Sequence, residues 1–232
     1  MLINNFISLI FNFIDNYIGL NHLMISSILI IVLLLFLWLS KNKINFKNII
    51  IIIITFDLII FNSFLIIDKS LNIIDFLPLH LCYLTEVMIL ISLLLKSKKF
   101  INLIFLNSIV GGIAGLVNTN LTINMHQIFH IHHYLAHFTL ILYAIYKSPI
   151  IELNLKILLS CIFRTGTILI LVIIFNLIFG TNYWFTQLKP NGNNLTLIFP
   201  ESPWHLVILV FLGLFIYFLT YLKFRVIKNE TK

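Results

Sequence analysis

The segment Leu77–Leu95, LPLHLCYLTEVMILISLLL, decides how the rest of the chain is interpreted. It is apolar enough to cross a bilayer, yet its first half carries His80, Cys82 and Glu86. An ionisable residue at the centre of a membrane helix costs about 2.5–3.5 kcal/mol on insertion scales, so such residues usually mark a function. Proline is tolerated in the first helical turn. Pro78 therefore predicts the start of a membrane helix, with Cys82 about one turn inside it.

The composition of the whole chain agrees with a membrane protein. Of its 232 residues, 60% are hydrophobic and only 10% are charged, and the mean hydropathy is +1.07. Soluble domains carry about 25% charged residues. We therefore expect an all-α, multi-pass membrane protein in which residues 1–232 form a single domain.

Seven apolar segments of membrane-spanning length follow one another along the chain. They are Leu23–Leu39, Asn48–Ile67, Leu77–Leu95, Ile101–Val117, Gln127–Tyr146, Lys156–Phe179 and Trp204–Leu222. Residues 22–222 are accordingly predicted to form a bundle of seven transmembrane helices. Ahead of it, residues 1–21 place apolar residues at helical spacing among polar ones. This pattern predicts an amphipathic helix on the outer membrane surface.

The net charge of +7 is explained by membrane topology. Twelve of the fifteen basic residues fall on one side of the predicted bundle: Lys41, Lys43, Lys47, Lys96, Lys98, Lys99, Lys147, Lys156, Lys223, Arg225, Lys228 and Lys232. Only Lys69 and Lys189 fall on the other side, and Arg164 lies within a span. By the positive-inside rule the N-terminus is outside, and residues 223–232 form a basic cytoplasmic tail. A nucleic-acid partner is not expected.

Histidines gather between residues 126 and 137. On an ideal helix His126, His130, His133 and His137 form one narrow stripe, whereas His132 falls off that face. Such clustering inside a predicted membrane span favours a functional role for the two deeper members, His133 and His137.

Depth in the bilayer follows from 1.5 Å of rise per residue, counted from the outer end of each span. Cys82 and His133 are then roughly 8–9 Å deep. Glu86, His137 and Asp57 are roughly 14–15 Å deep, near the bilayer midplane. The sequence thus predicts a Cys/His layer near the outer headgroups and an Asp/Glu/His layer beneath it.

Arg164 is unusual because the chain contains 13 Lys and only two Arg. An arginine inside a predicted span must find a partner. A structural ion pair between Arg164 and Glu86 or Asp57 is therefore the main alternative to a functional role for these two carboxylates.

Several short motifs resemble one family of membrane proteins. Leu77–Cys82 resembles the LPxHLC signature of YwaF-type bacterial integral membrane proteins. Gly180–Tyr183 is similar to that family's GTNY segment, and Pro203–Trp204 to its Trp-rich stretch before the last helix. His133–His137 is similar to its aromatic-rich segment ending in His. The resemblance implies a multi-pass protein of a bacterial plasma membrane.

The same family is akin to the animal transmembrane protein 164 type, which is regarded as a group of acyltransferases that remodel ether phospholipids. The resemblance implies that Cys82 is the acyl-accepting nucleophile and that His137 is its partner. This chain departs from the family by its extra histidines before the fifth span, so His133 competes with His137 for that role.

The leading interpretation is a lipid acyltransferase or lipid hydrolase that acts from the outer half of the bilayer. Cys82 would attack an ester carbonyl, and His137 or His133 would accept the thiol proton. Glu86 or Asp57 would orient the imidazole, as a carboxylate does in a catalytic triad.

Substrate contacts are expected from a second set of residues. Asn182, or backbone N–H groups at the helix start near Pro78, would hold the oxyanion. The complete set of substrate-binding candidates is His80, Arg164, Asn182, Tyr183 and His205. This mechanism needs no cofactor, its partners are membrane lipids that donate and accept the acyl group, and the oligomeric state stays open.

Two other functions are compatible with the same residues. In the first, His133, His137 and Asp57 or Glu86 bind zinc and activate water, which would make the protein a metal-dependent intramembrane hydrolase. In the second, the buried carboxylates and histidines serve a proton-coupled transporter or binding protein. The chain has no visible inverted repeat, which argues against a transporter.

Overall fold

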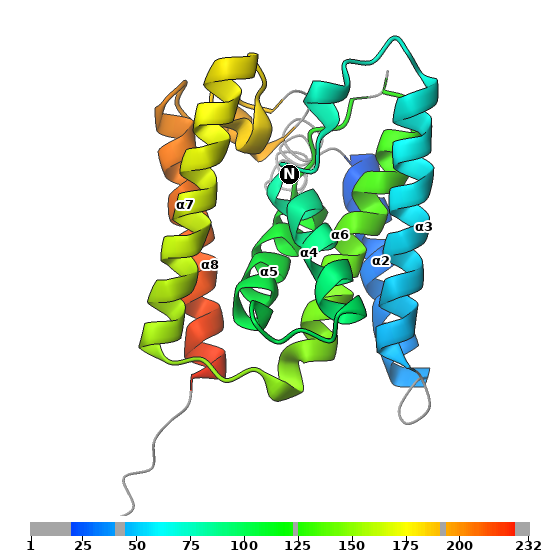
Figure 1. Cartoon of the computed structure of the whole chain (residues 1–232), viewed down its shortest axis with the longest axis vertical. Helices are drawn as coiled ribbons and strands as arrows, with labels where there is room; N and C mark the ends of the chain where they lie inside the picture. The colour runs from blue at the N-terminus through cyan, green and yellow to red at the C-terminus, as the bar shows by residue number, and fades with distance from the viewer. Residues whose placement is uncertain (1–19, 40–44, 123–124, 191–193, 226–232) are drawn as a thin grey trace, which may run out of the picture.

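The computed structural model describes residues 20–39, 45–122, 125–190 and 194–225, and within them it is entirely helical (Figure 1). The α-helices are α2 (Leu20–Leu39), α3 (Phe46–Ile67), α4 (Leu81–Leu94), α5 (Ile101–Val117), α6 (Gln127–Lys147), α7 (Leu155–Phe179) and α8 (Trp204–Phe224). Short 3-10 helices are η1 (Ile73–Phe76), η2 (Ser148–Ile150), η3 (Tyr183–Phe185) and η4 (Leu195–Ile198). The expected all-α fold is confirmed. The amphipathic helix predicted for residues 1–21 and most of the predicted tail, residues 223–232, lie outside the described residues.

Each α-helix coincides with one predicted span to within a few residues, and α5 has the predicted bounds. The start of α4 is the largest departure, because the span predicted from Leu77 begins as a helix only at Leu81. A residue before proline is pushed out of the helical region, and Leu77 is accordingly extended, with φ −59° and ψ 154°. His80 is also extended and caps the helix, so Cys82 is the second helical residue.

The helices fall into two length classes. α3, α6, α7 and α8 are long and apolar enough to cross a membrane, and α2, α4 and α5 contribute shorter apolar stretches. The 14 residues of α4 span only about 21 Å, against about 30 Å for the bilayer core. A short helix fits at membrane depth where protein rather than lipid surrounds its ends. The protein is therefore a helical membrane protein, whereas the count of seven crossings stays a prediction.

One face of α5 carries glycines, whose missing side chains let α5 and α6 pack closely together. A Cβ atom added to Gly112 would lie 2.5 Å from Cδ1 of Ile141, and one added to Gly115 would fall on the ring of His137. Both neighbours belong to α6, so these glycines let the two helices approach more closely than any other residue type would.

Helices α7 and α8 pack together as a pair beside α5, whereas α2 and α3 pack on the opposite side against α6 (Figure 1). A buried polar group joins the pair to α5. Tyr217 of α8 donates a hydrogen bond to the side-chain oxygen of Asn107 in α5, and Thr165 of α7 lies 2.9 Å from the Tyr217 hydroxyl. Apolar side chains surround this junction, which fixes the separation between the α7–α8 pair and the rest of the bundle.

The connections from α4 to α5 and from α6 to α7 lie at the same end of the bundle as the last turn of α8 (Figure 1). Lys47 and Lys98 are near enough to Lys147 to repel it electrostatically. The N–H of Leu153 donates to the carbonyl of Phe224 at 3.0 Å, which ties the α6–α7 connection to the end of α8. Lys47, Lys98 and Lys147 thus lie at one end, whereas Lys69 and Lys189 lie in the connections at the other end (Figure 1). Which end faces the cytoplasm stays a prediction.

Cysteine labelling in cells tests the predicted orientation of the bundle. Ser70 and Ser97 are exposed at opposite ends, and each can become cysteine in a background where Cys82 and Cys161 are alanine. A membrane-impermeant thiol reagent should label Ser70→Cys in intact cells and Ser97→Cys only after the cells are opened, because the positive-inside rule predicts that the lysine-rich end faces the cytoplasm. The reverse labelling pattern would contradict the orientation.

Candidate functional site

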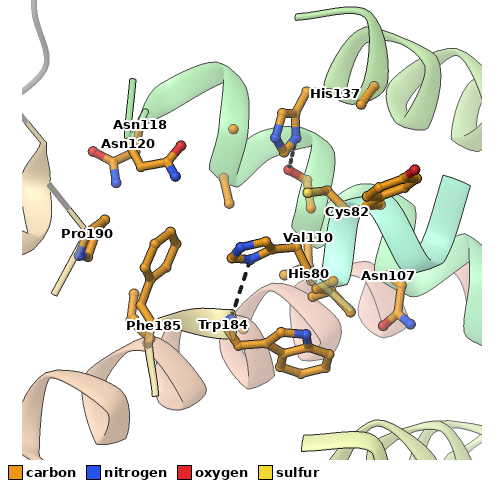
Figure 2. A pocket seen from close by; sticks show the side chains of 18 of the residues that line it. His80, Cys82, Asn107, Val110, Asn118, Asn120, His137, Trp184, Phe185 and Pro190 are labelled. Carbon is orange, nitrogen blue, oxygen red and sulfur yellow. Dashed lines mark hydrogen bonds between the residues drawn. The ribbon is translucent and has the colours of Figure 1, made fainter. Parts of the chain in front are cut away.

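A cavity of about 530 Å³ lies between the α7–α8 pair and helices α4, α5 and α6. Its lining is mostly aliphatic and aromatic, and the histidines, Cys82 and several Asn side chains provide its polar atoms (Figure 2). Ligand pockets of about 300–1,000 Å³ with apolar walls and a few polar groups are typical of small-molecule and lipid sites. The cavity is therefore the candidate site of the protein.

Cys82 enters the cavity from the first turn of α4. No side chain caps this helix end, so the partial positive charge of the terminal N–H groups acts on the region around the thiol. A Cβ atom on Gly111 would lie 3.8 Å from the Cα atom of Cys82, so the thiol-bearing residue packs directly on α5. Both cysteines are free, and Cys161 is buried in a different apolar cluster.

His137 and His133 are oriented by backbone carbonyls of α5. Nδ1–H of His137 donates to the carbonyl oxygen of Gly111 at 2.8 Å, and Nε2–H of His133 donates to that of Gly115 at 3.1 Å. A carbonyl can only accept, so the neutral ring of His137 carries its proton on Nδ1 and leaves Nε2 able to accept one. Gly111 thus contacts both Cys82 and His137, which Figure 2 shows close to the same part of the cavity wall.

We predicted that a carboxylate would orient His133 or His137, but neither histidine bonds to a carboxylate in the structure. Oδ2 of Asp57 accepts a hydrogen bond of 2.7 Å from Nδ1 of His132 instead. Glu86 lies in the same group, and the three residues offer ligand atoms within 4.8 Å of one another. The structure also leaves the alternative zinc set of His133, His137 and Asp57 divided between two groups.

Sequence reasoning set His132 aside because it falls off the histidine stripe. That displacement turns His132 toward α3, where its ring stacks on Phe61 at 3.9 Å between centroids and meets Asp57. A signal was present in the sequence: a buried carboxylate needs a donor, and the histidine off the stripe was the one left to supply it.

Arg164 does not line the main cavity, and it forms no ion pair with a carboxylate among the residues that the structure describes. Its guanidinium lies over the ring of Phe100 at 5.3 Å, in a separate cavity of about 280 Å³ whose lining also includes Lys98, Lys99 and Lys156. The alternative ion pair between Arg164 and Glu86 or Asp57 is therefore not formed. Arg164 belongs to α7, which packs on α5 and α8, whereas the two carboxylates belong to α3 and α4.

Three of the other predicted substrate contacts, Asn182, Tyr183 and His205, form hydrogen bonds that hold the connection between α7 and α8 in place. The Asn182 side chain accepts from the N–H groups of Gln187 and Leu188, which uses its carbonyl within its own loop. His205 is fully buried and its Nε2–H donates to the carbonyl of Phe185 at 2.7 Å. Tyr183 is buried too, and its hydroxyl donates to Ile74.

The same connection holds the extended segment before α4. The indole N–H of Trp184 donates to the carbonyl of Leu79 at 2.6 Å, and its backbone N–H donates to Nδ1 of His80 at 3.4 Å (Figure 2). Trp184 and Phe185 both line the cavity with positive φ, 57° and 52°, a conformation that non-glycine residues rarely adopt. Of the predicted substrate contacts, His80 alone lines the cavity.

The sequence pattern of the TMEM164 family matches residues 17–221 of the chain, which include helices α2 to α7, most of α8 and the cavity between them. The chain belongs to the TMEM164 family. No curated protein and no solved structure matches it. The match covers the three features that define the cavity in this TMEM164 family protein: Cys82 at the start of α4, the glycine face of α5 and His137 of α6.

The glycine face provides a test of the packing around His137. Gly115→Ala should lower the free energy of unfolding by about 1–3 kcal/mol, because the added methyl group collides with the imidazole ring. Gly166→Ala is the matched control in α7, where a Cβ atom meets nothing within 4 Å, and it should stabilise the helix by about 0.5–1 kcal/mol. Thermal unfolding of both variants in detergent measures the difference. Equal stability of the two would contradict the packing described here.

Proposed function

We propose that the protein is a lipid acyltransferase in which Cys82 carries the acyl group during transfer. The observation behind this proposal is the position of Cys82, at an uncapped helix N-terminus that opens into a large apolar cavity beside histidines. An apolar cavity can bind acyl chains by burial alone. A polar wall on one side supplies the groups that the chemistry needs.

Two walls of the cavity would contribute to lipid binding in different ways. The acyl chain would lie against aliphatic side chains such as Leu169, Leu206 and Leu209 of α7 and α8, which line the cavity opposite Cys82. Burial of an acyl chain contributes about 0.8 kcal/mol per CH₂ group. Most of the affinity would thus come from the chain, and the ester would be placed by the polar wall.

The first half of the reaction forms a thioester. Sγ of Cys82 attacks the carbonyl carbon of the donor ester while its proton passes to Nε2 of His137. The C–O bond then breaks, and the departing alcohol takes the proton from the imidazolium. The Gly111 carbonyl keeps the ring in the required tautomer by accepting from Nδ1–H.

The second half returns the enzyme to its starting state. The hydroxyl group of an acceptor lipid gives its proton to Nε2 of His137 and attacks the thioester carbonyl. The C–S bond breaks and the thiolate recovers the proton. Water in place of the acceptor would make the same site a lipid hydrolase.

In both halves of the reaction, negative charge develops on the carbonyl oxygen and must be stabilised by hydrogen-bond donors. The first N–H groups of a helix have no intrahelical partner, and those of α4 flank Cys82. They are better placed than Asn182, whose side-chain oxygen already accepts two backbone hydrogen bonds. The oxyanion would therefore be stabilised by the backbone of α4.

The predicted topology supplies the setting for this reaction. It would place the cavity in the outer half of a bacterial plasma membrane, with phospholipids as donors and lipids bearing a free hydroxyl group as acceptors.

Replacement of Cys82 tests the nucleophile directly. Purified protein reconstituted in vesicles should transfer a labelled acyl group from a phospholipid to a lysophospholipid. Cys82→Ala should reduce this turnover by at least about a hundredfold, because no other group can form the thioester. Cys161→Ala is the matched control and should keep full turnover, since this thiol lies in another cluster.

A covalent intermediate gives a second measurement of the same step. Wild-type protein incubated with donor alone should acquire one acyl group that hydroxylamine removes, and mass spectrometry should assign it to Cys82. Normal transfer by Cys82→Ala would exclude the proposed mechanism.

A further inference from the structure

Two buried carboxylates and a half-buried histidine from three helices meet outside the proposed acyl-transfer machinery. Asp57 of α3, Glu86 of α4 and His132 of α6 offer ligand atoms that all lie within 4.8 Å of one another. The exposed fractions of Asp57 and Glu86 are 2% and 0%, and that of the His132 side chain is 13%. Of these three residues only His132 lines the cavity, together with its aromatic neighbours Phe61 and Tyr83. The two carboxylates therefore lie behind the cavity wall.

The two carboxylates of this group lack a compensating cation among the described residues. Both carboxylate oxygens of Glu86 are buried and lack a hydrogen-bond donor among the described residues. Its interacting neighbour is a second carboxylate, Asp57, whose hydrogen bond comes from His132. No lysine or arginine forms an ion pair with either carboxylate in the described part of the chain. Two enclosed carboxylates of this kind cannot both stay ionised without a positive charge between them.

We propose that Asp57, Glu86 and His132 bind one divalent transition-metal cation, with zinc as the best fit. Zinc is bound by imidazole nitrogen and carboxylate oxygen at about 2.0–2.2 Å, most often with four ligands. Three protein ligands leave the fourth position to water. A neutral imidazole and two carboxylates also balance the ion's charge, which the apolar surroundings favour.

The distances need only a small adjustment. Ligand atoms around a tetrahedral zinc lie about 3.4 Å apart, as follows from metal–ligand distances of about 2.1 Å. Binding would replace the 2.7 Å hydrogen bond between His132 and Asp57, and the neutral ring would carry its proton on Nε2 so that Nδ1 can bind the metal. Side-chain movements of about 1 Å would bring ligand atoms that lie at the 4.8 Å limit into that range.

The neighbours of His132 hold its ring in position for this role. Phe61 stacks on one face, with an interplanar angle of 8°, and Tyr83 meets the ring edge-on at 5.0 Å between centroids. The Tyr83 hydroxyl accepts from Asn62 at 2.7 Å, which links the surroundings of the site back to α3. Ligands fixed by such outer contacts lose little conformational entropy when the metal binds.

The site would fasten α3, α4 and α6 together beside the cavity. This role does not depend on acyl transfer, because Cys82 and His137 are not among the ligands. The metal site and the proposed function therefore fail or succeed separately.

Metal analysis of the intact protein is the first test. Protein is purified without a polyhistidine tag from cells grown with added zinc. Elemental mass spectrometry should then find about one zinc ion per chain. Glu86→Gln, Asp57→Asn and His132→Gln should each lower the zinc content at least tenfold. Glu152→Gln is the control, because this exposed glutamate lies in the α6–α7 connection, and Cys82→Ala should keep its zinc while losing turnover.

A titration of wild-type protein decides the matter even where a variant fails to fold. After removal of metal by a chelator, micromolar zinc should raise the melting temperature by several degrees, and millimolar magnesium should not. Folded wild-type protein that contains no zinc and shows no shift with zinc or manganese would overturn the proposal. That result would mean that the carboxylates share a proton instead.

Discussion

Close contact between α5 and α6 is the constraint on which the rest of the structure depends. A side chain at Gly112 or Gly115 would collide with Ile141 or His137, so only glycine permits this separation. The short distance has a chemical consequence as well as a packing one. It exposes the carbonyl groups of Gly111 and Gly115 to the histidines of α6, which donate to them. The same glycine face receives Cys82 from α4, so one packing feature positions both candidate catalytic groups.

Helix α6 consequently contributes histidines to two separate polar groups, one facing α5 and the other facing α3. Adjacent residues of a helix are about 100° apart, so His133 can face α5 while His132 faces α3. The first histidine meets a backbone carbonyl and the second meets a buried carboxylate. The contrast explains why Asp57 and Glu86 do not orient the imidazoles beside Cys82. The carboxylates lie on the α3 side of α6, whereas the side facing α5 carries histidines that bond to backbone carbonyls.

Hydropathy was sufficient to predict the helices, because each one is an apolar stretch bounded by polar residues. The bounds of α5 and the C-terminal ends of α2, α3 and α7 agree with the sequence. Helix periodicity also grouped His133 with His137. It could not predict which helix each face meets, since the rotation of a helix about its axis depends on its neighbours. The pairing of His132 with Asp57 and the distance of Arg164 from both carboxylates follow from that rotation.

The roles of loop residues were beyond prediction for a different reason. Asn182, Tyr183 and His205 are polar or aromatic residues near a candidate site, which is the usual mark of a binding residue. In the structure Asn182 and His205 of α8 bond to backbone groups of the connection between α7 and α8, and the Tyr183 hydroxyl donates to the carbonyl of Ile74 in η1. Short sequence motifs record that such residues are needed, but they do not separate a residue that binds substrate from one that shapes a loop.

The late start of α4 connects the fold to the proposed chemistry. In a helix that began at Pro78, the N–H of Cys82 would donate to the carbonyl of Pro78, four residues earlier. The extended segment from Leu77 to His80, held by hydrogen bonds from Trp184, removes that acceptor from reach. The first N–H groups of the helix thus stay available beside the thiol. A proline that only marked the start of a membrane span would serve the fold, whereas a proline two residues before the cap also leaves donors where a developing oxyanion needs them.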